Sequence, residues 1–528
     1  LTIANGTATF SAAQTGNIGV GDAVYYGAPT STAYITRKLS QTQWTLMTAT
    51  GSVPADVSTA TSVNAILRAF SSLSSAENTA PTVLGTSDLW TNNYQLNFPL
   101  YYDTGADTNA VTIDGYTTAP QNYIRVYTPN DTARQANQSQ RHQGKWDEGK
   151  YLLKISNEIN NGVIVIESDY SVLDGIQINT NSTIELNVSG VLIYGANALI
   201  SNNIIKSTNR DLAYGFGIDF DFYEASESGK VWNNVIYGFL NRDEMSGGIK
   251  TYYWWDRIYI SNNTVFGNYY GISSWGNGPI AIASNNISYN NTINYTGTFH
   301  ASSTNNLSGP TQTDAPGSNP QNAKTVQFLD PTNHDFHLSP NDTSARNMGT
   351  SSTFTAPDSP LTFYTDIDGT PRGAAYDIGA DEVPTEFVST ICENASAGGS
   401  CAQLDYNTLA RWEDKVESDL TATSTRVFSG TLTGNLSEND VVTLYRGASS
   451  TGITGMVVAT TSAGQILVDS ISAGLECPGH SVSDSDTECR EYPLSVAQGD
   501  VWRKDGSNYF TVGGTGDALG ASPIAVED

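Results

Sequence analysis

The sequence predicts an all-β protein in which a right-handed parallel β-helix is flanked by small N- and C-terminal β-sandwich or barrel-like modules. Three observations predict this: a repeat of 20 to 31 residues in the middle of the chain, an abundance of Gly, Asn, Ser, Thr and Tyr, and similar outermost segments. We expect an N-terminal module over 1–55, a capping helix with irregular rungs over 56–150, the β-helix over 151–385, a linker with a short helix over 386–420, and a C-terminal module over 421–528.

The central repeat combines an Asn-Asn pair with a Gly-Ile pair. Successive Asn-Asn pairs are 31, 29, 23 and 20 residues apart, and the Gly-Ile pairs precede three of them by 16, 14 and 14 residues. This period, with its constant phase, is typical of a solenoid of short strands. Asparagines that merely form turns are the alternative interpretation. In a β-helix, buried asparagines can bond one another between rungs, and the predicted ladder is Asn202, Asn233, Asn262, Asn285 and Asn305.

Four segments after the repeat resemble a known superfamily. They are Phe328-Leu-Asp-Pro331, Phe336-His-Leu-Ser-Pro340, Asp366-Ile-Asp-Gly-Thr-Pro-Arg372 and Tyr376-Asp-Ile-Gly-Ala-Asp-Glu382. With the repeat, they make this part similar to the right-handed β-helix superfamily, which includes pectate lyases and many bacterial surface proteins. The resemblance implies that the four segments are the closing rungs. It implies little about function, since this fold carries both enzymes and inert scaffolds.

Residues 62–76 are predicted to form a helix that covers the N-terminal end of the β-helix, because an open end would expose strand edges. Ser62 is a suitable N-cap. The strands 111–113 and 123–127 are expected in the first irregular rungs. The apolar face of the helix would consist of Val63, Ile66, Leu67, Phe70 and Leu73.

The two ends of the chain resemble each other. Residues 10–24 align without gaps to residues 428–442 and are identical at seven of fifteen positions. Alternating apolar residues around an Asn or Gly-Asp turn indicate β-hairpins, so a shared hairpin composition is one explanation and a shared module is the other. A rod with related modules at both ends could join head to tail into a filament.

Charge and cysteine content restrict the partners and the compartment. The net charge of −28 disfavours nucleic acid, whose phosphates need clustered Lys and Arg. No run of 18 apolar residues occurs, so membrane insertion is not expected. The cysteines form two close pairs that predict local disulfides, rather than zinc ligands, and an extracellular or cell-surface location; they are Cys392 with Cys401 and Cys477 with Cys489.

The alternation of side chains along the Gly-Ile strands predicts a polar strip on the outer face. If Ile218, Ile249 and Ile272 point inward, their neighbours point outward, and rungs stack about 4.8 Å apart. Candidates for acid–base chemistry in the strip are Asp219, Asp221, Lys250 and Arg257. Candidates for stacking on sugar rings are Tyr223, Tyr252, Trp254 and Trp275. Burial of the strip by a loop or another subunit is the alternative.

Two further polar features stand outside the strip. Asp366 and Asp368 lie in a Gly-containing turn and could hold a structural Ca²⁺, although such residues more often cap a turn. His142 lies in a dense polar segment, where a single histidine is usually structural. No other cofactor is expected, and no motif of a serine hydrolase, zinc protease or P-loop occurs.

The predicted function is a non-catalytic structural protein that polymerises with copies of itself through its terminal modules, as a filament or a surface layer. The alternatives are a secreted polysaccharide lyase or glycoside hydrolase, and an adhesin or tailspike-like protein that binds a surface polysaccharide. Polymers would favour the first, and released sugars the second.

Overall fold

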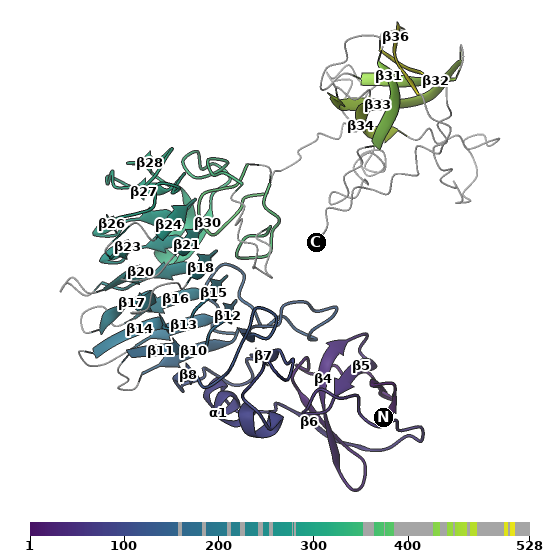
Figure 1. The fold of residues 1–528 in the computed structure, drawn as a ribbon, viewed down its shortest axis with the longest axis vertical. Coiled ribbons are helices and arrows are strands. Elements are labelled where there is room, and N and C mark those ends of the chain that lie inside the picture. The colour runs from purple at the N-terminus through teal and green to yellow at the C-terminus, as the bar shows by residue number, and fades with distance from the viewer. Residues whose placement is uncertain are drawn as a thin grey trace, which may run out of the picture. The chain divides into compact units, whose positions relative to one another are not determined.

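The computed structural model describes residues 1–156, 161–181, 186–208, 213–221, 228–240, 246–252, 257–276, 278, 281–351, 364–373, 375–384 and six strands between 426 and 512. The chain divides into two compact units, Leu1–Thr385 and Glu386–Asp528, which are drawn in Figure 1. No helix among the described residues is long and apolar enough to cross a membrane.

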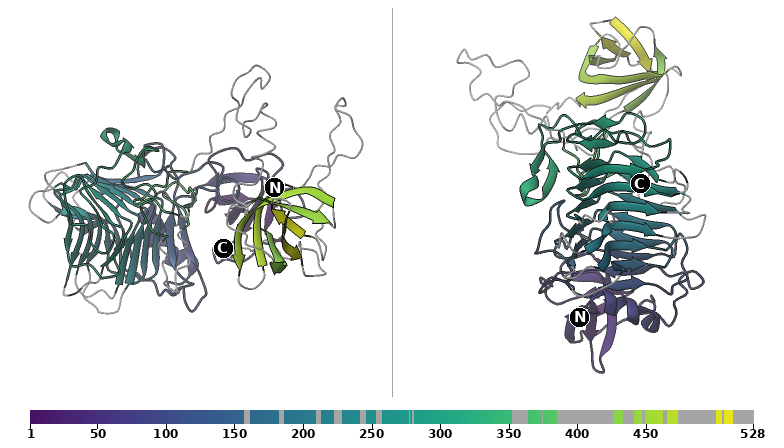
Figure 2. Two further views of the ribbon diagram at one scale, coloured as in Figure 1. Left: turned by 90° about the horizontal axis from the view of Figure 1, so that it is seen from above. Right: turned by 90° about the vertical axis from the view of Figure 1, so that its left-hand side faces the viewer.

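The middle of the first unit is a parallel β-helix, as predicted, and Figure 2 shows its strands stacked rung upon rung. It consists of three parallel sheets. The first contains β10 (Leu152–Ile155), β13 (Gln177–Thr180), β16 (Ile204–Ser207), β19 (Val235–Tyr237), β22 (Thr264–Phe266), β25 (Ile287–Tyr289), β27 (Leu307–Gly309) and β28 (Gln321–Asn322).

The other two sheets complete each rung. The second contains β8 (Val111–Ile113), β11 (Asn161–Ile166), β14 (Leu186–Ile193), β17 (Ala213–Asp221), β20 (Ser246–Tyr252), β23 (Tyr270–Trp275) and β26 (Ile293–Gly297). The third contains β7 (Leu96–Pro99), β9 (Ile124–Tyr127), β12 (Ser171–Asp174), β15 (Ala198–Ser201), β18 (Ser228–Trp232), β21 (Arg257–Ser261) and β24 (Ala281–Ser284).

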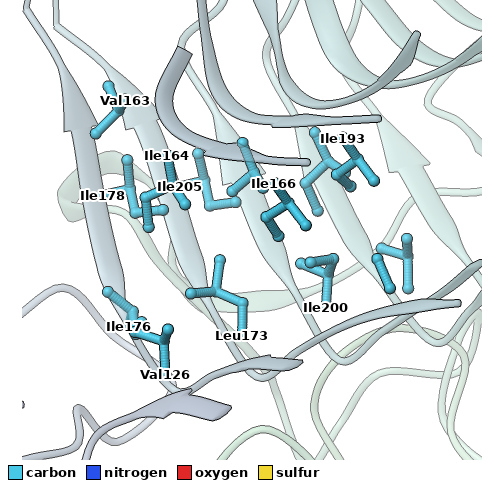
Figure 3. Packing of buried hydrophobic residues seen from close by; sticks show 14 of the residues in the cluster. Val126, Val163, Ile164, Ile166, Leu173, Ile176, Ile178, Ile193, Ile200 and Ile205 are labelled. Carbon is cyan, nitrogen blue, oxygen red and sulfur yellow. The ribbon is translucent and has the colours of Figure 1, made fainter. Parts of the chain in front are cut away.

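Stacked aliphatic side chains fill the interior of the β-helix. Figure 3 shows Ile166 and Ile193 on successive rungs among other buried isoleucines and valines. The glycine of each Gly-Ile pair is needed because a side chain there would collide with residues of the first sheet. A Cβ atom on Gly217 would lie 2.3 Å from Cγ2 of Ile236, so no larger residue fits there.

The N-terminal end of the β-helix is covered by α1 (Leu73–Leu84), so the prediction of a helix over 62–76 is wrong in position. Residues 63–67 form strand β6 instead, because this segment pairs with β3 and the half-buried Ile66 packs against the core of the N-terminal module. The helix starts after Ser72, whose Oγ accepts a bond from Ser75 N at 3.0 Å. Its residues Leu73, Ala76 and Ala80 belong to the β-helix core.

The N-terminal module is an antiparallel sheet of six strands in the order β1-β2-β5-β4-β3-β6. Ile3 and Val57 form a bridge, and Leu1 exchanges backbone bonds with Thr61, so the chain leading into β6 closes onto β1. The strands are β1 (Thr2–Ala4), β2 (Thr7–Thr9), β3 (Ala23–Tyr26), β4 (Ser31–Lys38), β5 (Gln43–Met47) and β6 (Val63–Leu67).

The second unit contains a closed barrel in the order β31-β34-β33-β32-β35-β36. Its strand order repeats that of the N-terminal module. The strands that correspond are β2 and β31, β5 and β34, β4 and β33, β3 and β32, and β6 and β35. The remaining strand, β1, takes the position in the N-terminal module that β36 has in the barrel. The strands are β31 (Arg426–Leu432), β32 (Val441–Arg446), β33 (Ser449–Thr461), β34 (Gln465–Ser472), β35 (Val501–Lys504) and β36 (Ser507–Val512).

The segments after β28 are not closing rungs, so that expectation was wrong. β29 (Phe328–Asp330), the short 3₁₀ helix η1 (Pro331–Asn333) and β30 (Asp335–Leu338) form a hairpin. A strap, residues 364–384, runs back along the outer face of the first sheet. The sheet requires this cover because its outer face is apolar; Ile204, Val235 and Tyr237 pack against Phe336, Ile367 and Ala380.

Candidate functional site

The outer face of the second sheet carries the strip in the predicted register. Asp219 on β17 lies beside Lys250 on β20, and Lys250 lies beside Ser273 on β23. In the same way Asp221 neighbours Tyr252, which neighbours Trp275. The alternating residues Ile218, Ile249 and Ile272 are fully buried in the core, so the predicted alternation is confirmed for these strands.

Asp219 and Lys250 form a buried ion pair. Lys250 Nζ lies 2.9 Å from Asp219 Oδ1 and 3.7 Å from Asp221 Oδ2. Ser189 Oγ donates to Asp219 Oδ2 at 3.2 Å. Burial raises the pKa of the Asp219 carboxyl, and the Lys250 ammonium opposes that shift. Only 3% of Asp219 and 6% of Lys250 are exposed, so neither side chain is open to a large substrate.

Aromatic rings surround this pair. Lys250 Nζ lies 5.5 Å from the ring centre of Phe216 and 5.1 Å from that of Tyr252, distances at which a cation is attracted to a ring. Trp275 packs edge-on against Phe216 and Tyr270. Tyr252, Trp275 and Asp221 are half-buried, so this edge of the strip is its accessible part.

Of the other predicted strip residues, only Arg257 is among the described residues. Arg257 is the first residue of β21, which belongs to the third sheet and not to the second. Tyr223 and Trp254 lie outside the described residues. So do all four cysteines and the linker 386–420, for which disulfides and a short helix remain predictions.

The asparagine ladder exists, but its continuous part is one residue later than predicted. The first asparagine of each pair has a left-handed backbone, with φ between 51° and 55°, which turns its side chain outward. The second points inward and is buried. The Nδ2-to-Oδ1 bonds of this inner ladder run from Asn203 to Asn234 (2.9 Å), Asn234 to Asn263 (3.0 Å), Asn263 to Asn286 (3.0 Å) and Asn286 to Asn306 (3.0 Å).

The outer asparagines hold the chain that covers them. Two bonds join them to each other, from Asn233 to Asn202 and from Asn285 to Asn262, both at 3.1 Å. Four of them also donate to carbonyl groups of the segments after the β-helix: Asn233 to Thr365 (2.8 Å), Asn262 to Asp377 (2.9 Å), Asn285 to Thr350 (2.7 Å) and Asn305 to Met348 (2.9 Å). Asn202 instead donates to Asp174 Oδ1 at 2.8 Å, within the β-helix.

A second ladder escaped the sequence reasoning. Asn268 donates to Asn291 at 3.1 Å and Asn291 to Asn294 at 3.0 Å, and all three are buried. A signal was present, because Asn268 and Asn291 each follow the inner asparagine of their rung by five residues. The β-helix is therefore fixed at two corners by buried amides.

In the turn that was a candidate for Ca²⁺, the carboxylates of the two aspartates have different partners. Asp366 caps the turn, since its Oδ1 accepts bonds from Asp368 N at 2.9 Å and Thr370 N at 2.8 Å. Burial, followed by the nearby Asp368 charge, raises the pKa of Asp366 to about 6. Asp368 instead turns toward His337 on β30, and its Oδ2 lies 2.9 Å from His337 Nε2.

His337 is the centre of a cluster that sequence reasoning missed, because a single histidine in Phe336-His-Leu gives no spacing to recognise. His337 Nδ1 lies 2.5 Å from Asp335 Oδ1, and Lys145 Nζ lies 3.1 Å from Asp335 Oδ2. Asp381 accepts a bond from Leu338 N at 2.6 Å. One ligand atom each of His337, Asp368 and Asp381 lies within 4.8 Å of the others.

The charges within this cluster are coupled. Burial would lower the pKa of His337, but the bonds to Asp368 and Asp335 and the nearby carboxylates raise it to about 10. Burial raises the pKa of Asp381 to about 7. As a result, the ring can donate from both nitrogen atoms and tie β30 to the strap.

Two comparisons with known proteins gave matches. A family model described as "Protein of unknown function (DUF1565)" matches residues 144–315. No curated protein matches. A solved structure, "Crystal structure of pectate lyase Pel9A", is 16% identical, covers 55% of this chain and 86% of that chain, and has a TM-score of 0.28. The three parallel sheets and the stacked asparagines identify the chain as a parallel β-helix protein.

Proposed function

We propose that this chain is a non-catalytic extracellular structural protein that assembles head to tail through its terminal β-modules. The observation that supports the proposal is the shared strand order of the two modules, one at each end of the sequence. The sequence match covers equivalent parts of the two modules: residues 10–24 follow directly after β2 and enter β3, and residues 428–442 begin within β31 and enter β32. Val24 and its counterpart Val442 are both fully buried, as expected if the match reflects a common module.

Exposed apolar side chains give the N-terminal module a surface suited to contact. A contiguous exposed apolar patch on a monomer marks a place where another protein binds, and we propose that these side chains belong to such a contact. Contact between two different modules on neighbouring copies is heterologous, and such a contact builds an open polymer unless its rotation closes a ring. The exposed side chains of this module include Leu39, Met47, Val53, Val63 and Leu67.

The burial of the ion pair argues against catalysis at the strip. A general acid or base must come within hydrogen-bond reach of its substrate, and Asp219 and Lys250 are both nearly inaccessible and already paired. The half-buried edge formed by Tyr252, Trp275 and Asp221 supports a second candidate, weak binding of a surface glycan. Aromatic faces pack against sugar rings, and a carboxylate accepts bonds from hydroxyl groups.

Electron microscopy and light scattering of the full-length chain test the assembly. We expect linear polymers whose mean length increases with protein concentration. Replacing Val53 and Leu67 by Asp should shorten them, because charges would enter the contact, whereas Leu329→Asp, another exposed leucine outside the module, should not. Monomers at all concentrations, or closed dimers, would contradict the proposal.

Glycan binding is tested separately, on an array of polysaccharides. Trp275→Ala should abolish any specific binding if the edge of the strip is the site. The matched control is Trp90→Ala, which removes an exposed tryptophan elsewhere in the same unit. Equal binding by both variants would exclude the strip, and sugar release from a pectin-like substrate would contradict the non-catalytic proposal.

A further inference from the structure

We propose that His337, Asp368 and Asp381 bind one divalent transition-metal ion of the Zn²⁺ class, which fastens the hairpin and the strap over the β-helix. The three residues come from β30, from the turn after Asp366 and from the end of the strap. Their ligand atoms lie within 4.8 Å of one another. Ligand atoms around a zinc ion are about 3.3 Å apart, and His337 Nε2 and Asp368 Oδ2 are already 2.9 Å apart.

Buried polar atoms without a partner give a second reason to place a cation here. Asp368 Oδ1 is buried and accepts no bond from any described group. His142, only 2% exposed, uses Nε2 for the carbonyl of Asn202, 2.9 Å away, so a neutral ring leaves a lone pair on Nδ1, which is also buried without a described partner. Asp368 is close enough to His142 to act on its pKa.

The backbone is shaped around the same atoms. Gly144, two residues after His142, has a φ of 63°, and a Cβ atom there would lie 2.4 Å from His337 Nε2 and 2.5 Å from Asp368 Oδ1. Any other residue at this position would therefore displace the imidazole of His337 and the carboxylate of Asp368, two of the proposed ligands. The glycine keeps the segment against them without filling the space beside them.

The donor set selects the class of ion. One imidazole nitrogen with two carboxylate oxygens suits Zn²⁺, Co²⁺ or Mn²⁺, whereas Ca²⁺ takes oxygen ligands only. Ligating histidines usually donate their other N–H to a carboxylate, which orients the ring. Asp335 occupies that place, 2.5 Å from His337 Nδ1, and Lys145 fixes Asp335 in turn. The proposed site therefore takes one ionisable side chain from each of the three segments that it would join.

Calorimetry and thermal unfolding of the full-length chain with ZnCl₂ at pH 8 test the site, where zinc binding must release the proton that His337 Nε2 shares with Asp368 in the metal-free protein. We expect one equivalent to bind with micromolar affinity or better. The apparent melting temperature should rise with the logarithm of the zinc concentration, and EDTA should reverse the rise. CaCl₂ should produce neither effect.

Asp335→Asn, which removes only the orienting carboxylate, should weaken zinc binding about 10- to 100-fold.

Asp381→Asn separates loss of metal from loss of folding. The amide is nearly isosteric and still accepts the bond from Leu338 N, so in EDTA this variant should melt at or above the wild-type temperature, yet gain nothing from zinc. His300→Gln removes an imidazole outside the cluster and should behave as wild type. Zinc binding retained by both Asp381→Asn and His337→Gln, or no binding by wild type, would overturn the proposal.

Cysteine thiolates could also bind zinc, and Co²⁺ distinguishes them. Cobalt bound to nitrogen and oxygen ligands gives visible d–d bands without the intense near-ultraviolet charge-transfer band of cobalt–thiolate bonds. We expect d–d bands that disappear in His337→Gln. A thiolate band alone would assign the metal to the cysteines and contradict the site.

Discussion

At the scale of single residues, each asparagine inside the inner ladder makes several buried hydrogen bonds at once. Asn263 Oδ1 accepts from both N and Nδ2 of Asn234 at 3.0 Å, and its own Nδ2 donates to Asn286 and Val231. Asn263→Ala should therefore lower the free energy of unfolding by roughly 3–5 kcal/mol, because several buried groups lose their partners together. Asn290→Gly, at an exposed left-handed position, should change it by less than about 1 kcal/mol. Chemical denaturation of the two variants measures the difference.

His142 should make the first unit sensitive to acid. Burial, followed by the charge of Arg141, lowers the pKa of His142 from 6.5 to about 4. Between these values the unfolded chain binds a proton that the folded chain does not, so stability should fall as pH falls from 6.5 to 4, by up to about 3 kcal/mol. His142→Gln can still donate to the carbonyl of Asn202 but does not titrate. The difference in unfolding free energy between wild type and this variant should shrink over that range.

At the scale of elements, the strap depends on one buried arginine. Arg372 Nη1 lies 3.1 Å from Glu382 Oε2, and Nη2 donates to Asn233 Oδ1 at 2.8 Å. A lysine ammonium is a single compact group, so it does not span the two acceptors as the planar guanidinium does. Arg372→Lys should therefore loosen residues 364–384 and speed their hydrogen exchange, while the strands of the β-helix keep their protection. Arg346→Lys, whose guanidinium bonds only the Pro340 carbonyl among described groups, serves as the control.

The elements also show what the sequence could predict. Period and alternation are local properties, so the rungs, the core isoleucines and the Asp219–Lys250 register followed from them. Residues 63–67 have helical spacing but form β6, because β3 offers a partner that spacing does not reveal. The strap contains the motifs of a final rung, yet its place depends on the apolar outer face of the first sheet. His337, Asp368 and Asp381 lie up to 44 positions apart in the sequence, with no pattern in between.

At the scale of the whole molecule, the two modules differ in one informative way. They share a strand order, but the place of β36, the last described strand, is taken in the N-terminal module by β1, the first. The modules are thus circular permutants, so two closely similar folds present their chain ends differently. A contact between them joins unlike surfaces, and the resulting polymer would have a direction.

That direction can be tested with a chain that ends at residue 385, the boundary between the two units. Such a chain keeps the N-terminal module and lacks the barrel, so it can occupy the end of a polymer but cannot be extended from its missing side. Added in small amounts to full-length protein, it should shorten the polymers in proportion to its mole fraction, and a gold label on it should mark one end only. Labels at both ends, or along the length, would show that the modules do not make the contact.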